Sequence, residues 1–108
     1  MSRTIITNSG SDFITNINAE NLLGHLCEEA GVKFSTGLFD NTTLAYSMTK
    51  EEAIQAGQGL LKLTERVDIL YPKYKIYLHK TVGVTGFKHI IEDYAKDFIK
   101  SEGYDCVS

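Results

Sequence analysis

The sequence predicts an α+β fold: a mainly antiparallel sheet built from two hairpins plus one or two further strands, with three amphipathic helices packed on one face. Strings of β-branched and aromatic residues alternate with turn-forming residues, and three longer segments place apolar residues at helical spacing. The expected order is ββα-ββα-β-α, with room for a last strand. With 108 residues, 43% hydrophobic and 23% charged, we expect one globular domain over residues 1–108.

The first ββα unit begins with a hairpin over residues 3–17. Its strands are residues 4–7 and 12–15, and the intervening Asn-Ser-Gly-Ser string is turn-forming. In the helix that follows, Asn18 is the expected N-cap and Gly31 supplies the left-handed residue that commonly ends a helix. One helix face carries Leu22, Leu23, Leu26, Cys27 and Ala30.

A second hairpin is expected over residues 32–47, and its register selects a loop length. A three-residue loop at 39–41 places the large apolar side chains on one face, with Asn41 at the position that requires positive φ. The residues on that face are Phe34, Leu38, Leu44 and Tyr46. We expect this face to pack against the last helix.

The second helix begins at a capping box formed by Thr49 and Glu52. Its apolar positions are Ala53, Ala56, Leu60, Leu63 and Val67. Gly57 and Gly59 interrupt it at a cost of roughly 1 kcal/mol each relative to Ala. Close packing against another element explains them better than close approach of a ligand.

Pro72 is expected to end this helical region, and residues 74–82 then form a strand. Tyr74, Ile76 and Leu78 would face the core. Lys73, Lys75, Tyr77 and His79 would share the other face.

The last helix is expected to be capped by Thr85 and to end at Gly103. Its broad apolar stripe is formed by Phe87, Ile90, Ile91, Tyr94, Phe98 and Ile99. A short strand over residues 104–107 would close the chain.

The net charge of −3 is unevenly distributed. Residues 1–61 carry three basic and seven acidic groups, residues 62–90 six basic and two acidic, and residues 91–108 two basic and five acidic. The chain has no predicted signal peptide or membrane span, so we expect a cytoplasmic protein with free thiols at Cys27 and Cys106.

No arrangement of residues indicates catalysis, a metal or a cofactor. His25 with Glu28, and His89 with Asp93, lie at helical spacing, but neither pair has a third ligand. Cys27 lies among apolar and acidic neighbours, which would raise its pKa rather than activate it. We therefore expect a protein that is not an enzyme.

The turn over residues 83–86 is a weak candidate for anion binding, because a glycine-rich turn that opens a helix can present backbone N–H groups. The residues involved are Lys80, Gly83, Thr85, Gly86 and Lys88. Their spacing matches neither a P-loop nor a dinucleotide fingerprint, so an ordinary strand-to-helix turn is favoured.

The strongest candidate surface is the basic face formed by Lys73, Lys75, Tyr77 and His79. It suits an acidic protein partner, or stacking on single-stranded nucleic acid; a merely solvated face is the ordinary alternative.

The function predicted from these observations is a non-catalytic binding module with a protein partner, such as a small acidic inhibitor or immunity-type protein of the kind that phages and mobile elements carry. A nucleic-acid-binding domain is the first alternative. A small enzyme or anion-ligand domain is the second. A homodimer is compatible with each.

Overall fold

The computed structural model describes residues 2–32 and 47–107. In this part of the chain the protein is mainly helical, with a small antiparallel sheet. The predicted fold, a sheet built from two hairpins and covered by helices, is therefore wrong. The second hairpin expected over residues 32–47, with its loop at 39–41 and the face of Phe34, Leu38, Leu44 and Tyr46, falls almost wholly outside the described residues.

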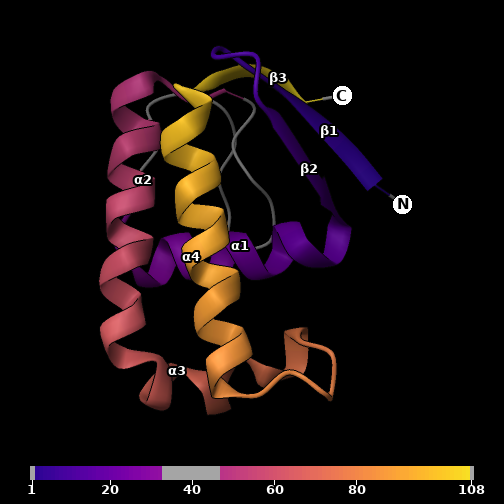
Figure 1. The fold of residues 1–108 in the computed structure, drawn as a ribbon, viewed down its shortest axis with the longest axis vertical. Coiled ribbons are helices and arrows are strands. Elements are labelled where there is room, and N and C mark those ends of the chain that lie inside the picture. The colour runs from indigo at the N-terminus through magenta and orange to yellow at the C-terminus, as the bar shows by residue number, and fades with distance from the viewer. Residues whose placement is uncertain (1, 33–46, 108) are drawn as a thin grey trace.

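The sheet joins the two ends of the chain. Strand β1 (Ser2–Thr7) pairs antiparallel with β2 (Asp12–Asn16) on one side and with β3 (Tyr104–Val107) on the other, so the strand order is β2-β1-β3. Figure 1 shows both termini at this sheet. The first hairpin and the last strand are confirmed.

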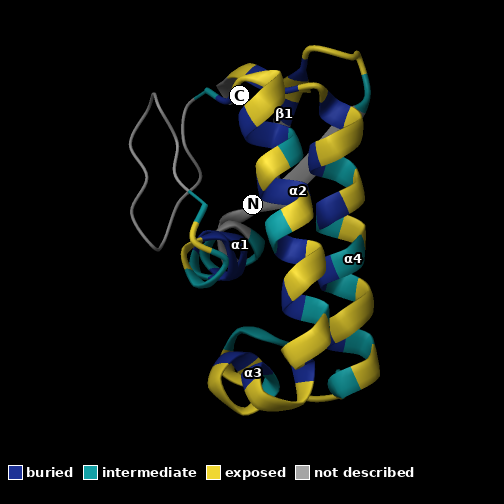
Figure 2. Ribbon diagram, turned by 90° about the vertical axis from the view of Figure 1, so that its left-hand side faces the viewer, coloured by how far each residue is buried: buried dark blue, intermediate teal, exposed yellow. Residues whose placement is uncertain are grey.

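Four helices make up most of the described chain. They are α1 (Ile17–Glu29), α2 (Lys50–Leu63), α3 (Val67–Tyr74) and α4 (Val84–Ser101), with two short 3-10 turns, η1 (Thr64–Arg66) and η2 (Lys75–Tyr77), before and after α3. Helices α2 and α4 lie side by side, α1 crosses them, and α3 lies at the end away from the sheet (Figures 1 and 2). No helix in the described part of the chain is long and apolar enough to cross a membrane.

The α2–α4 contact depends on Gly57. A Cβ atom at this position would overlap Ile99 Cγ1 and lie 2.8 Å from the carbonyl oxygen of Ala95. At Gly59, a Cβ atom would lie 3.2 Å from Ala30 Cβ. Both glycines therefore allow close packing between elements, as the sequence predicts.

The N-terminus of α2 also forms as predicted. The Glu52 backbone N–H donates to Thr49 Oγ1 at 3.1 Å, and the Thr49 N–H donates to Glu52 Oε1 at 2.9 Å. This reciprocal pair satisfies two backbone donors that would otherwise lack partners at the helix end.

The core lies where the four helices and the sheet meet (Figure 2). Its largest fully buried side chains come from β1, all helices except α3, and β3. They are Ile5, Leu23, Leu26, Cys27, Leu60, Leu63, Phe87, Ile91, Phe98 and Tyr104. Most of the apolar positions predicted for the three helices are therefore buried.

The predicted strand over residues 74–82 is the clearest error within the described chain. Pro72 lies inside α3, and the helical conformation continues through η2 to Tyr77. Tyr74 is buried as predicted, but Ile76 is 77% exposed and does not face the core. The buried positions Val67, Leu70 and Tyr74 follow helical spacing, so packing of α3 outweighs the missing N–H of Pro72.

Two predicted N-caps are also wrong. Helix α1 begins at Ile17, which places Asn18 inside its first turn. Helix α4 begins at Val84 with Gly83 as its N-cap, so Thr85 lies in the first turn and does not cap the helix. Gly31 and Gly103 do adopt the expected left-handed region, with φ of 74° and 93°.

Candidate functional site

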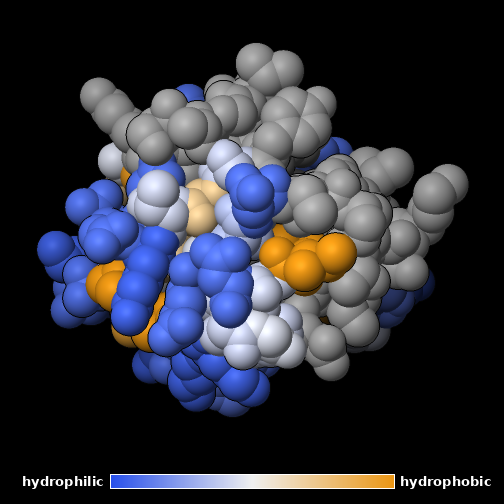
Figure 3. Space-filling view, turned by 90° about the horizontal axis from the view of Figure 1, so that it is seen from above, coloured by the Kyte–Doolittle hydropathy of each residue, from blue (hydrophilic) through white to orange (hydrophobic). Residues whose placement is uncertain are grey.

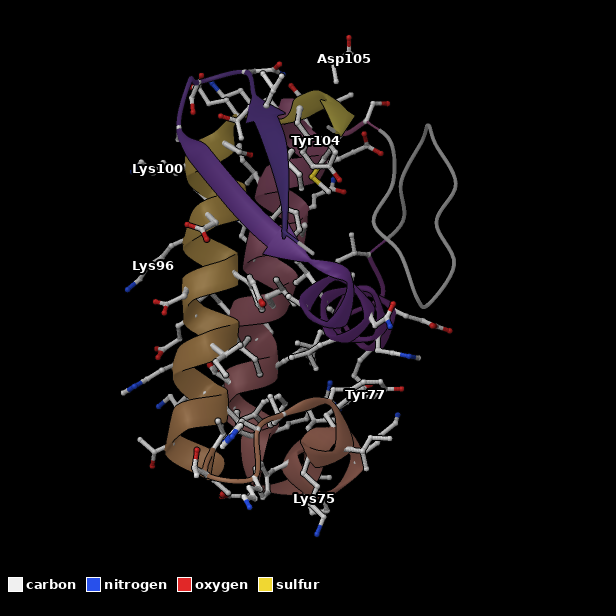
Figure 4. The ribbon with its side chains drawn as sticks, turned by 90° about the vertical axis from the view of Figure 1, so that its right-hand side faces the viewer. Lys75, Tyr77, Lys96, Lys100, Tyr104 and Asp105 are labelled. Atoms are coloured by element: carbon white, nitrogen blue, oxygen red, sulfur yellow. The ribbon has the colours of Figure 1, made fainter. Side chains whose placement is uncertain are left out.

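The four residues of the predicted basic face do not share a strand face. Lys73 lies in α3, Lys75 and Tyr77 lie in η2, and His79 follows that turn. In Figure 4 the Lys75 side chain points away from the rest of the molecule, whereas Tyr77 lies between α3 and α1. The helical backbone thus separates these side chains into different environments.

Lys73 is bound to α1 by an ion pair. Its Nζ donates to Glu29 Oε1 at 2.7 Å and lies 5.3 Å from the ring centroid of Tyr74. The Lys73–Glu29 contact connects residues that are 44 positions apart in the sequence.

Glu29 accepts a second hydrogen bond, from the Tyr74 hydroxyl at 2.8 Å. The hydrogen bonds from Lys73 and Tyr74 lower the pKa of the Glu29 carboxyl. Burial, together with the hydrogen bond to Glu29, raises the pKa of Tyr74 to about 12. The same bond to Glu29 raises the pKa of Lys73. Glu29 is therefore a carboxylate and Lys73 an ammonium ion at neutral pH.

His25 and Tyr77 form a second contact between α1 and the segment after α3. Tyr77 Oη and His25 Nε2 share a hydrogen bond of 2.9 Å, and the two ring centroids lie 4.9 Å apart. The Tyr77 ring is therefore packed against α1.

These contacts surround a surface pocket of about 450 Å³. It is lined by His25, Glu28, Glu29, Lys73, Tyr74 and Tyr77. A neighbouring pocket of about 430 Å³ is lined by Asn21, Ile76, Tyr77, Leu78 and His79. Two pockets thus open along the junction of α1 with the α3–η2 segment, and Tyr77 lines both.

The α3–η2 segment also exposes large apolar side chains. Ile69 is 75% exposed and Ile76 is 77% exposed, more than any other large apolar side chain whose burial the structure describes. They are seven residues apart within one helical run, and Pro72, which is also exposed, lies between them at helical spacing. We call Ile69, Pro72 and Ile76 the α3 face. At the sheet end, Figure 3 shows hydrophilic side chains over much of the described surface, with apolar patches among them.

The predicted anion-binding turn opens α4. Lys80, Gly83, Thr85 and Lys88 are exposed, and Gly86 packs near Val82. The Phe87 N–H donates to the Gly83 carbonyl oxygen at 2.9 Å, as in an ordinary first helical turn. Anion binding at this turn stays a prediction.

Within residues 2–32 and 47–107, no group of three or more His, Cys, Asp or Glu side chains is placed to hold a metal ion. Burial raises the pKa of the Cys27 thiol to about 12, which agrees with the increase predicted from its neighbours. Such a thiol is not a nucleophile near neutral pH.

The sequence analysis did not predict the hydrogen bonds of Lys73 and Tyr74 to Glu29. The available signal was the spacing of Val67, Leu70, Tyr74 and Tyr77, which fits a helix and places Tyr74 and Tyr77 on one side.

In comparisons with protein-family models, curated proteins and solved structures, nothing matches this chain. A functional assignment therefore depends on the side chains described above.

Proposed function

We propose that the protein is a non-catalytic binding module that recognises an acidic, amphipathic surface of another protein through the α3 face. The observation that carries this proposal is the exposure of Ile69 and Ile76, at 75% and 77%, which lie about two turns apart along the α3–η2 segment. Single exposed apolar residues are ordinary, but several together on one face are typical of docking surfaces.

Charge around the α3 face supports an acidic partner. Residues 66–80 contain Arg66, Lys75 and Lys80, besides Lys73, whose charge is paired with Glu29, and one acidic residue, Asp68. Complementary charge speeds association and orients the partner, while burial of the isoleucines supplies affinity. If the surface that the α3 face covers is the partner's active surface, the protein acts as an inhibitor or immunity-type protein.

The nucleic-acid alternative has less support. It relied on Tyr77 as an exposed stacking platform on a strand, whereas the Tyr77 ring packs 4.9 Å from the His25 ring. Exposed bases would have to displace that contact.

The test is a quantitative pull-down from the native host with three proteins: wild type, the double variant Ile69→Asp/Ile76→Asp, and Leu61→Asp as a control. Leu61 is an exposed apolar residue on α2, outside the α3 face. We expect a partner that the double variant loses and Leu61→Asp retains. Charge reversal at Lys75 should slow association with that partner.

Two results would contradict the proposal. One is a partner retained by the folded double variant. The other is tight binding of labelled single-stranded DNA or RNA at physiological salt, measured by fluorescence anisotropy, that Tyr77→Ala abolishes. Sedimentation of the purified protein separates a homodimer from binding of a different protein.

A further inference from the structure

The pocket between α1 and α3 combines aromatic rings with carboxylates. The ring centroids lie 4.9 Å apart for His25 and Tyr77, 6.3 Å for Tyr74 and Tyr77, and 6.4 Å for His25 and Tyr74. The face of an aromatic ring is partially negative, so rings grouped beside Glu28 and Glu29 attract positive charge.

The ammonium group of Lys73 already contacts both an aromatic ring and a carboxylate of this pocket. Lys73 Nζ lies 5.3 Å from the Tyr74 ring centroid and 2.7 Å from Glu29 Oε1. The volume of about 450 Å³ is what remains with Lys73 in place. The pocket therefore stabilises one ammonium ion at its wall and still has room for another group.

The remaining hydrogen-bonding capacity includes carboxylate acceptors, beside the N–H donors of Lys73 that Glu29 does not use. The Tyr74 hydroxyl donates to Glu29 Oε1, and the Tyr77 hydroxyl is bonded to His25. Among the described residues, no hydrogen bond or ion pair engages the Glu28 carboxylate, although it lines the pocket. With Lys73 balancing Glu29, the charge of Glu28 is left for a ligand that donates hydrogen bonds.

We propose that this pocket binds an organic cation, an ammonium or guanidinium group that packs against the half-buried ring of Tyr77 and pairs with Glu28. Two sources share this chemistry: a free small amine, and a lysine or arginine side chain of another protein. The proposal does not depend on the α3 face, because Ile69, Pro72 and Ile76 do not line this pocket.

The test follows the ring signals of His25 by NMR during titration with two cations and their neutral counterparts. N-acetyl-arginine amide is compared with N-acetyl-citrulline amide, and 1,4-diaminobutane with 1,4-butanediol. We expect saturable shifts of His25 with at least one cation and none with either neutral compound. The signals of His89, on α4, serve as an internal reference.

Two variants with matched controls make the result specific. Glu28→Gln should weaken binding about threefold, because it removes an exposed ion pair, and Glu92→Gln, the same change on α4, should not. Lys73→Gln should strengthen binding by a similar factor, because it removes the internal competitor from Glu29 and Tyr74. Lys96→Gln removes the same charge from α4, far from Tyr77 in Figure 4, and should leave affinity unchanged.

Binding of the arginine compound alone would identify a protein side chain as the source, and binding of the diamine alone would identify a free amine. Equal shifts with the neutral compounds, or no shift with either cation, would overturn the proposal. Equal effects of Lys73→Gln and Lys96→Gln would do so as well, since they would show only a general response to surface charge.

Discussion

Glu29 connects α1 to α3 through side-chain hydrogen bonds, because its carboxylate accepts from both Tyr74 and Lys73. The strength of this link depends on the charge of Glu29, since a hydrogen bond to an ionised acceptor is stronger than one to a neutral acceptor. Stability should therefore depend on pH in a predictable direction.

We predict that Tyr74→Phe lowers the free energy of unfolding by about 1 kcal/mol at pH 7, because it removes the hydroxyl that donates to Glu29 and leaves the ring in place. The folded state lowers the pKa of Glu29 below its ordinary value of 4.5, so this stabilisation is complete above pH 4.5 and is lost as the pH falls through the folded value. In urea titrations, the difference between wild type and Tyr74→Phe should therefore shrink on acidification. A difference that is constant with pH would mean that Glu29 is not the acceptor.

For single residues, the sequence predicts which side chains are buried better than it predicts which side chains bond to each other. Cys27 could be placed in the core because its helical neighbours Leu23 and Leu26 are apolar. The bonds of Glu29 to Lys73 and Tyr74 span 44 and 45 residues. Local spacing holds no information on such pairs, which depend on how α3 docks against α1.

Helix ends provide a direct comparison between a predicted cap that forms and one that does not. Thr49 forms the capping box of α2, whereas Thr85 lies inside the first turn of α4, where Gly83 is the N-cap without a side-chain hydrogen bond. Both threonines precede an amphipathic segment, so the sequence alone favours both as caps.

We predict that Thr49→Ala lowers the free energy of unfolding by about 1 kcal/mol, within the usual range for loss of an N-cap. Thr85→Ala is the matched control and should change stability by no more than a few tenths of a kcal/mol, because Thr85 is exposed and caps nothing. Thermal unfolding measures both. Equal losses would show that Thr85 does cap α4.

The segment over residues 67–78 shows why one element was predicted incorrectly. Tyr74, Ile76 and Leu78 alternate as in a strand, but Tyr74, Tyr77 and Leu78 also fit a helix. A short apolar run fits both the two-residue period of a strand and the 3.6-residue period of a helix, and Pro72 favours the end of a helix. The exposure of Ile76 and the burial of Val67, Leu70 and Tyr74 show that tertiary packing selects the helical period.

In the whole molecule, three distant parts of the chain meet beside β3. Met48 and Tyr104 exchange two backbone hydrogen bonds, of 2.7 and 2.9 Å, and the Asn8 N–H donates to the Gly103 carbonyl oxygen at 2.8 Å. The sequence predicts strands at both ends of the chain, but the pairing of β3 with β1 is a long-range contact that no local pattern encodes. Gly103 lies at this junction.

We predict that Gly103→Ala is among the most damaging single substitutions in the molecule. Gly103 has a φ of 93°, and a Cβ atom there would overlap the Met48 carbonyl oxygen and lie 2.9 Å from the carbonyl carbon of Thr49. Gly31→Ala is the control, because Gly31 also has positive φ, 74°, but faces open space. Backbone strain should cost each variant roughly 1–2 kcal/mol, and steric overlap should add about 1–3 kcal/mol at Gly103 alone. Urea unfolding of both variants measures the difference, and equal losses would show that β3 does not meet Met48 as described.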